Sequence, residues 1–226
     1  MLTTHKRHLT EVRRSTKIKH LHYILSFGFI PFLSGIFFLV YSQIERWSIS
    51  LLLGNEELGK MYLFFIIVTL WVLIPNSILN ILYPKAIKYY ADQDKERFHK
   101  TIRDNLKIIL LYNIIGIISI ILFLSSIISL LFPKHLPYVY LVYLAIPGLI
   151  SRQFVDPISL FFNSVICLKP LFWSDLFSLL VYCISILYFY LTNNIHIYSF
   201  IICFDIFFFS KLLYSLIYYV RIKNKY

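Results

Sequence analysis

Three long stretches without a charged residue constrain this chain more than any other feature. Residues 21–44, 61–84 and 108–133 contain no Asp, Glu, Lys or Arg. A helix needs about 20 apolar residues to cross the hydrocarbon core of a bilayer, and helices of soluble proteins are rarely this long and apolar on every side. The stretches also lack the alternation that a transmembrane β-barrel requires. The sequence therefore predicts a helical protein that crosses a membrane several times.

Three later segments are long enough to span as well, although each contains charge: residues 136–168, 171–191 and 195–220. The composition agrees, with 59% hydrophobic residues and a mean hydropathy of +0.73. We therefore expect an all-α integral membrane protein, a single bundle of six transmembrane helices. The expected parts are a basic N-terminal segment at residues 1–20, the bundle at residues 21–220 and a basic tail at residues 221–226.

The basic residues alternate along the connections between these spans. Residues 1–20 and 85–107 are rich in Lys and Arg, whereas residues 45–60 hold two basic residues against three acids and the turn after the third span holds only Lys134. Short cytoplasmic loops retain positive charge and translocated loops are depleted in it. Both termini are therefore predicted to be cytoplasmic. These loops account for the net charge of +11, so no nucleic-acid partner is expected.

The sequence shows no signature of an enzyme. It contains no glycine-rich phosphate loop, no paired acidic cluster that would hold Mg²⁺, and no Ser-His-Asp or HExxH arrangement. The three cysteines fall inside hydrophobic spans without the spacing of a metal site or a disulfide framework. We expect no catalytic residue, no metal and no cofactor.

The fourth span carries an unusual polar face. Arg152, Asp156, Ser159 and Asn163 follow one another at helical spacing in an otherwise apolar segment. A charged group inside a membrane costs about 3 kcal/mol on insertion scales, and such groups usually face a bundle interior or an aqueous cavity. The pattern favours a cavity lining. The alternative is that Arg152 and Asp156 neutralise one another within a static bundle.

Other polar features in the spans carry weaker predictions. The prolines at positions 137, 147 and 157 predict kinks in the fourth span. Asn76 and Asn80 share a face of the second span, where hydrogen bonding between helices is an equal alternative to a role in transport. In the last two spans, Lys211 is expected to extend its amine to the membrane surface and Asp175 to cap the start of its helix.

Two hairpin motifs resemble a known family. Residues 43–47 read Gln-Ile-Glu-Arg-Trp, and residues 51–62 read Leu-Leu-Leu-Gly-Asn-Glu-Glu-Leu-Gly-Lys-Met-Tyr. This string resembles the first hairpin in the C-terminal lobe of polysaccharide flippases, and residues 74–85 with the charged segment after them resemble the next. The family is the O-antigen and exopolysaccharide translocases of the multidrug/oligosaccharidyl-lipid/polysaccharide exporter superfamily. The resemblance extends from about residue 19 onward, with Glu45 at a position where the family usually has Asp.

The resemblance implies a transport function. Family members have twelve or more spans in two lobes, so this chain resembles a C-terminal half. The implied activity moves an undecaprenyl-diphosphate-linked oligosaccharide from the cytoplasmic to the periplasmic leaflet of the bacterial inner membrane. The implied partners are this glycan-bearing lipid, membrane lipids, and either an N-terminal half or a second copy. The expected substrate pathway contains Arg152, Asp156, Ser159, Asn163, Asn76, Asn80, Glu45 and Arg46.

Two other functional classes stay open at this point. A membrane-embedded polysaccharide polymerase or lipid-linked glycosyltransferase would usually have a sizeable external loop with catalytic groups, and the external connections predicted here are short. A non-transporting assembly subunit is the second alternative, and the sequence does not distinguish it from a transporter.

Overall fold

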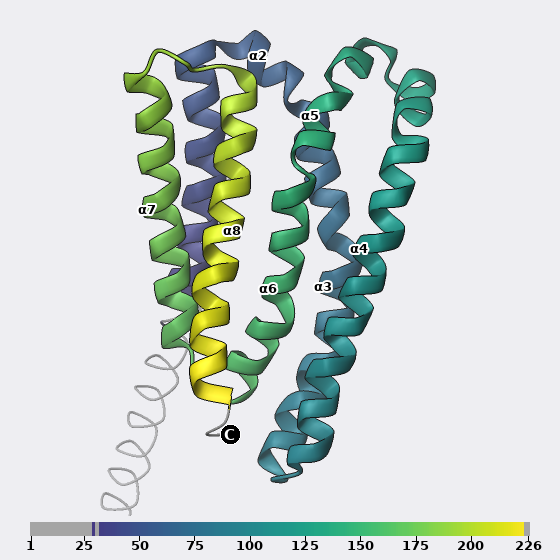
Figure 1. Cartoon of the computed structure of the whole chain (residues 1–226), viewed down its shortest axis with the longest axis vertical. Helices are drawn as coiled ribbons and strands as arrows, with labels where there is room; N and C mark the ends of the chain where they lie inside the picture. Colours follow the sequence, from purple (N-terminus) through teal and green to yellow (C-terminus); the bar gives the residue numbers. More distant parts are fainter. Residues whose placement is uncertain (1–28, 30–31, 224–226) are drawn as a thin grey trace, which may run out of the picture.

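The computed structural model describes residue 29 and residues 32–223 (Figure 1). The basic N-terminal segment, the first part of the first predicted span and the last three residues of the tail lie outside the described residues. Within the described part of the chain every regular element is a helix. The elements in order are an N-terminal helix at Phe32–Leu53, α2 at Asn55–Lys60, α3 at Tyr62–Ala91, α4 at Lys95–Leu131, the 3₁₀ helix η1 at Pro133–Tyr138, α5 at Val139–Leu144, α6 at Ile146–Ser164, α7 at Lys169–Leu191 and α8 at Ile197–Ile222.

The helices fit the predicted membrane protein. Five of them are long and apolar enough to cross a bilayer: the N-terminal helix, α2 with α3, α4, α7 and α8. The sixth candidate span is broken, because the segment Pro133–Leu144 and the segment Ile146–Ser164 meet at an angle of 55°. Pro147 lies at the start of α6 next to this break. Proline cannot donate to the preceding turn and its ring clashes with that turn, so a continuous helix through this point is disfavoured.

The connections between the helices lie at two opposite ends of the molecule. Figure 1 shows α2, α5 and the connection between α7 and α8 at one end, and the end of α8 and the turn between α3 and α4 at the other. This division follows the predicted alternation of loops poor and rich in basic residues. We call the end that holds the turn between α3 and α4 the basic end.

Three helices continue beyond the predicted boundaries of their spans. The first span was expected to end at residue 44, but the helix runs to Leu53, where Gly54 with a φ of 93° ends it. The charged connection at residues 85–107 is also mostly helical, since α3 and α4 extend through it on either side of a short turn. The turn covers residues 92–94, and Asp94 caps α4 by accepting a hydrogen bond from the Arg97 N–H at 3.0 Å. Charge limits how far a segment enters lipid, not how far it remains helical.

Helix α8 lies at the centre of the packing. It packs along both α7 and α6, and α6 packs in turn on α3 and α4. Aromatic rings fill the contact with the N-terminal helix: Tyr41 stacks on Phe207 with 3.9 Å between ring centroids and meets the edge of Tyr182 at 4.9 Å. Large apolar side chains on the outer faces of α4 and α7 remain exposed, as expected of surfaces that contact lipid.

Candidate functional site

The polar residues of the fourth span lie along one face of α6. Arg152, Asp156, Ser159 and Asn163 are half-buried, whereas most residues between them on the same helix are buried. We call this line the polar face of α6. It points toward the N-terminal helix, α7 and α8, as the contacts of its members show.

Arg152 is held by aromatic rings. Its guanidinium carbon lies 5.4 Å from the ring centre of Phe38 on the N-terminal helix and 5.2 Å from that of Phe208 on α8. Such contacts are worth about 0.5 to 2 kcal/mol each, more when they are shielded from water. Among the described residues, Arg152 makes neither a hydrogen bond nor an ion pair, not even with Asp156. Within the described part of the chain, its five N–H donors therefore have no acceptor.

A cavity of about 230 Å³ lies at the far end of the polar face. Ser159 and Asn163 line it from α6, and Ser34 lines it from the N-terminal helix. Asp175 of α7 and Lys211 of α8 complete its polar wall and form an ion pair of 2.5 Å. Asp156 lies within electrostatic range of both Arg152 and Lys211. The face therefore combines cations, carboxylates and amides inside an apolar bundle.

The ion pair corrects two expectations. Lys211 does not extend to the membrane surface, because its side chain is only 18% exposed and its amine contacts Asp175. Asp175 does not cap α7 either, since that helix begins at Lys169 and Asp175 lies in its second turn. Once its amine is buried, a lysine needs a partner of opposite charge, and Asp175 supplies one. The partner is 36 positions away in sequence, so spacing alone could not identify it.

The remaining predicted site residues are divided between the interior and the surface. Glu45 is 4% exposed and lies beside Tyr41 in the bundle, whereas Arg46 stacks over the ring of Phe65 on α3 at 5.0 Å. Asn76 and Asn80 are exposed on α3. Their amides make no hydrogen bond within the described part of the chain. The structure therefore brings the polar face of α6 together with Lys211 and Asp175, and it leaves the two asparagines outside this group.

One polar site was not anticipated from the sequence. Pro75 has no N–H, so the carbonyl of Trp71 lacks its donor within α3. The Tyr112 hydroxyl of α4 donates to this carbonyl at 2.9 Å, and the Gln153 amide of α6 donates at 3.2 Å. Gly116 leaves room for the Trp71 ring, because a Cβ there would lie 2.5 Å from it. The proline four residues after Trp71 is the sequence signal that this carbonyl lacks a donor within its own helix.

Asp205 has a structural partner as well. Its Oδ1 accepts a hydrogen bond of 2.8 Å from the N–H of Gly148, in the first turn of α6. The first N–H groups of a helix have no acceptor within the helix, and a carboxylate there is favoured by the helix dipole. Asp205 thus caps α6 from α8 and stabilises the second half of the broken span.

Comparisons with protein-family models, with curated proteins and with solved structures find no match for this chain. The functional argument therefore depends on the residues and their geometry. An arginine whose donors meet no acceptor among the described residues and a cavity with a lysine and a carboxylate form a polar line along α6, after the break that precedes this helix. Such a line can contact a polar or anionic solute at membrane depth.

Proposed function

We propose that this protein translocates a polyprenyl-diphosphate-linked oligosaccharide, the repeat unit of an O-antigen or exopolysaccharide, across the bacterial inner membrane. In this proposal the chain forms one lobe of a two-lobe flippase. The observation that carries the proposal is Arg152, a cation among apolar helices whose donors contact no acceptor in the described residues. The resemblance of the hairpin motifs at residues 43–62 supports the choice of substrate class.

The chemistry of the substrate fits the polar face of α6. The diphosphate and the sugars need a polar route through the bilayer, whereas the polyprenyl tail remains in lipid. A guanidinium presents a planar fork of donors that matches phosphate oxygens, and such hydrogen bonds are roughly twice as strong as neutral ones. The aromatic rings of Phe38 and Phe208 stabilise the cation without occupying those donors. Arg152 would therefore hold the diphosphate or sugar hydroxyls.

The exposed amides of α3 support a second lobe. Asn76 and Asn80 lie on a helix that has the length and apolarity of a membrane span, and both are exposed. An amide in contact with lipid loses its hydrogen bonds to water, so a polar partner surface is favoured there. In the proposal this surface belongs to a second lobe, either another copy or another chain. The bend of 55° before α6 provides a point at which the pathway can change shape.

Substitution of Arg152 in the native host tests the proposal. Arg152→Lys keeps the charge but loses the planar fork, so translocation should fall at least tenfold at unchanged protein abundance. The matched control is Arg221→Lys, an exposed arginine at the basic end, which should transport normally. The readouts are surface polysaccharide and lipid-linked repeat units that accumulate on the cytoplasmic side.

The charge-swapped variant Arg152→Asp/Asp156→Arg separates substrate contact from a static pair. A static pair would tolerate the exchange and restore both abundance and transport. A contact with substrate would not, because the guanidinium moves by one helical turn. Normal transport by the swapped variant, or by Arg152→Lys, would contradict the proposed role.

A further inference from the structure

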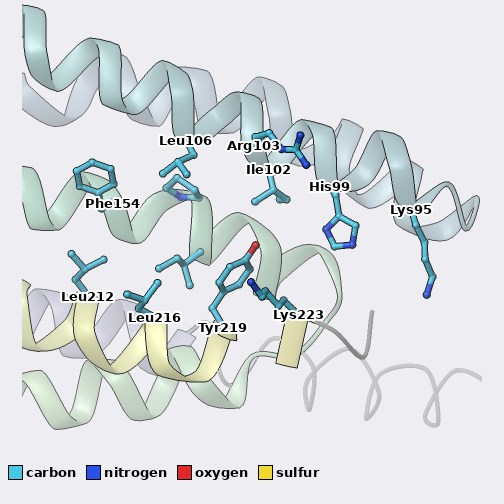
Figure 2. Close-up of a pocket in the computed structure, with 12 residues that line it drawn as sticks. Lys95, His99, Ile102, Arg103, Leu106, Phe154, Leu212, Leu216, Tyr219 and Lys223 are labelled. Atoms are coloured by element: carbon cyan, nitrogen blue, oxygen red, sulfur yellow. The ribbon is translucent and has the colours of Figure 1, made fainter. Parts of the chain in front are cut away.

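A second large hollow lies between α4, α6 and α8 at the basic end of the molecule (Figure 2). Its volume is about 870 Å³. We call it the α4–α8 groove. It is distinct from the polar face of α6: Phe154 lines the groove and is two positions from both Arg152 and Asp156, which places it about 200° around the helix from each. The two sites therefore use opposite sides of α6.

The groove is basic at one end and apolar along the rest. Lys95, His99 and Arg103 follow one another by four positions on α4, so they share a face that spans about 12 Å. Lys223 approaches from the end of α8, and Figure 2 shows these side chains toward one end of the groove. No acidic side chain lines it among the described residues.

The other wall residues are hydrophobic. Leu106 continues the face of α4, Phe154 contributes from α6, and Leu212 with Leu216 contributes from α8. Figure 2 shows these four side chains on the side of the groove away from Lys95, with Tyr219 between them and Lys223. The lining thus changes from cationic to apolar along the helix axes. This change matches an amphiphilic molecule with an anionic headgroup and an apolar tail.

The length of α4 relates this change to the bilayer. Its 37 residues correspond to about 55 Å, well beyond the roughly 30 Å hydrocarbon core. The charge-free part of the helix begins after Lys107, so Arg103 lies about 6 Å beyond the edge of the hydrocarbon, at headgroup level, and His99 and Lys95 continue the cationic face about 12 and 18 Å beyond that edge. Leu106 lies at the boundary with the hydrocarbon. The headgroup and tail of an amphiphile in the groove would therefore lie at the same depths as those of the surrounding lipids.

We propose that the α4–α8 groove binds an anionic phospholipid from the leaflet at the basic end. Arg103 and Lys223 would hold the phosphate headgroup, with the Tyr219 hydroxyl as a further donor and Lys95 adding positive charge at the same end, and an acyl chain would lie along Leu106, Phe154 and Leu216. Charge complementarity selects an anionic headgroup, and the continuous apolar lining selects a lipid over a soluble phosphate. Because α6 separates this site from Arg152, the lipid is a ligand additional to the proposed transport substrate.

Lipid retention by the purified full chain tests the headgroup contact. Phosphatidylglycerol and phosphatidylcholine are titrated onto delipidated protein, and bound lipid is measured by native mass spectrometry. The triple variant Lys95→Gln/Arg103→Gln/Lys223→Gln should retain phosphatidylglycerol at least tenfold less than wild type. The control Lys85→Gln/Lys88→Gln/Lys100→Gln removes equal charge from exposed residues of α3 and α4 outside the groove, and it should bind as wild type does. Equal losses in both triple variants would overturn the proposal.

A second pair of variants tests the apolar wall without a change of charge. Leu216→Trp fills the groove and should reduce retention of phosphatidylglycerol, whereas Leu213→Trp, on an exposed position of α8 outside the groove, should not. Wild-type binding by Leu216→Trp would overturn the proposal, even if the charge variants failed to fold. Equal retention of phosphatidylcholine would also overturn it, as would full competition by inorganic phosphate or tighter retention of undecaprenyl phosphate.

Discussion

The carbonyl of Trp71 offers a direct test of how this bundle compensates for a proline inside a span. Tyr112→Phe removes only the hydroxyl that donates to it at 2.9 Å and leaves the ring in place. A hydrogen bond of this kind contributes about 1 kcal/mol to stability. Double-mutant cycles on hydrogen bonds within a membrane protein give about 0.6 kcal/mol on average. We therefore expect Tyr112→Phe to lower the free energy of unfolding by about 0.5 to 1 kcal/mol.

The magnitude should depend on Pro75. Pro75→Ala restores an N–H four residues after Trp71, which can donate to the same carbonyl within α3. In this background the carbonyl has a donor within α3 as well as the Gln153 amide, so Tyr112→Phe should lower the free energy of unfolding by less than it does with Pro75. The difference between the two backgrounds is the coupling energy that the geometry predicts.

Unfolding by SDS in mixed micelles, followed by tryptophan fluorescence, measures all four members of this cycle. The control is Tyr143→Phe, whose hydroxyl bonds the Ser125 hydroxyl at 2.9 Å and not a backbone carbonyl. Tyr143→Phe should lower the free energy of unfolding by the same amount with Pro75 and with Ala at position 75. An equal cost of Tyr112→Phe in both backgrounds would refute the idea that the hydroxyl replaces the missing N–H of residue 75.

Two further predictions concern the broken span and the topology. Gly148→Ala should lower the free energy of unfolding by about 1 to 3 kcal/mol in the same assay, because the new Cβ would overlap the Asp205 carboxylate oxygen and lie 2.7 Å from the Phe204 ring; wild-type stability would show that these contacts relax freely. In a chain without its native cysteines, Cys at position 95 should react with a membrane-impermeant maleimide only after the inner face is opened. Cys at position 55, 135 or 193 should react from outside in intact cells, and the reverse pattern would show that the loop charges do not set the orientation.

The sequence predicted those parts of the fold that the lipid environment determines, namely the positions of the spans and their helical type. The charge-free stretches marked the spans because burial of charge in hydrocarbon is costly, and the helical type followed because the backbone must satisfy its own hydrogen bonds there. The ends of the helices were not determined by this argument. Glu45 was expected in an external turn, yet it is buried within a helix that continues to Leu53. A carboxyl group can remain inside a bundle when it is protonated or finds a polar partner, and single-sequence spacing does not reveal the neighbours that decide this.

The candidate site was predictable along one helix and not between helices. Spacing by three and four residues was sufficient to place Arg152 and Asp156 on one face of α6. The contact of Lys211 with Asp175 and the contact of Gln153 with Trp71 join distant positions, so they depend on which helices pack together. The grouping of Asn76 and Asn80 with the polar face had no such basis, and the structure leaves them on an exposed surface of α3.

The polar groups of α6 differ in whether their bonding capacity is already used. Gly148 donates to Asp205, and Gln153 donates to the carbonyl that Pro75 leaves unpaired, so both replace bonds that a membrane environment would otherwise leave unmade. Lys211 is paired with Asp175. Arg152 differs from all of these, since aromatic faces stabilise its charge while its donors contact no acceptor in the described part of the chain. A group that already makes its hydrogen bonds or its ion pair gains little from contact with a ligand. A ligand would instead supply Arg152 with acceptors for its N–H donors. This difference makes Arg152 the strongest candidate for contact with an anionic substrate.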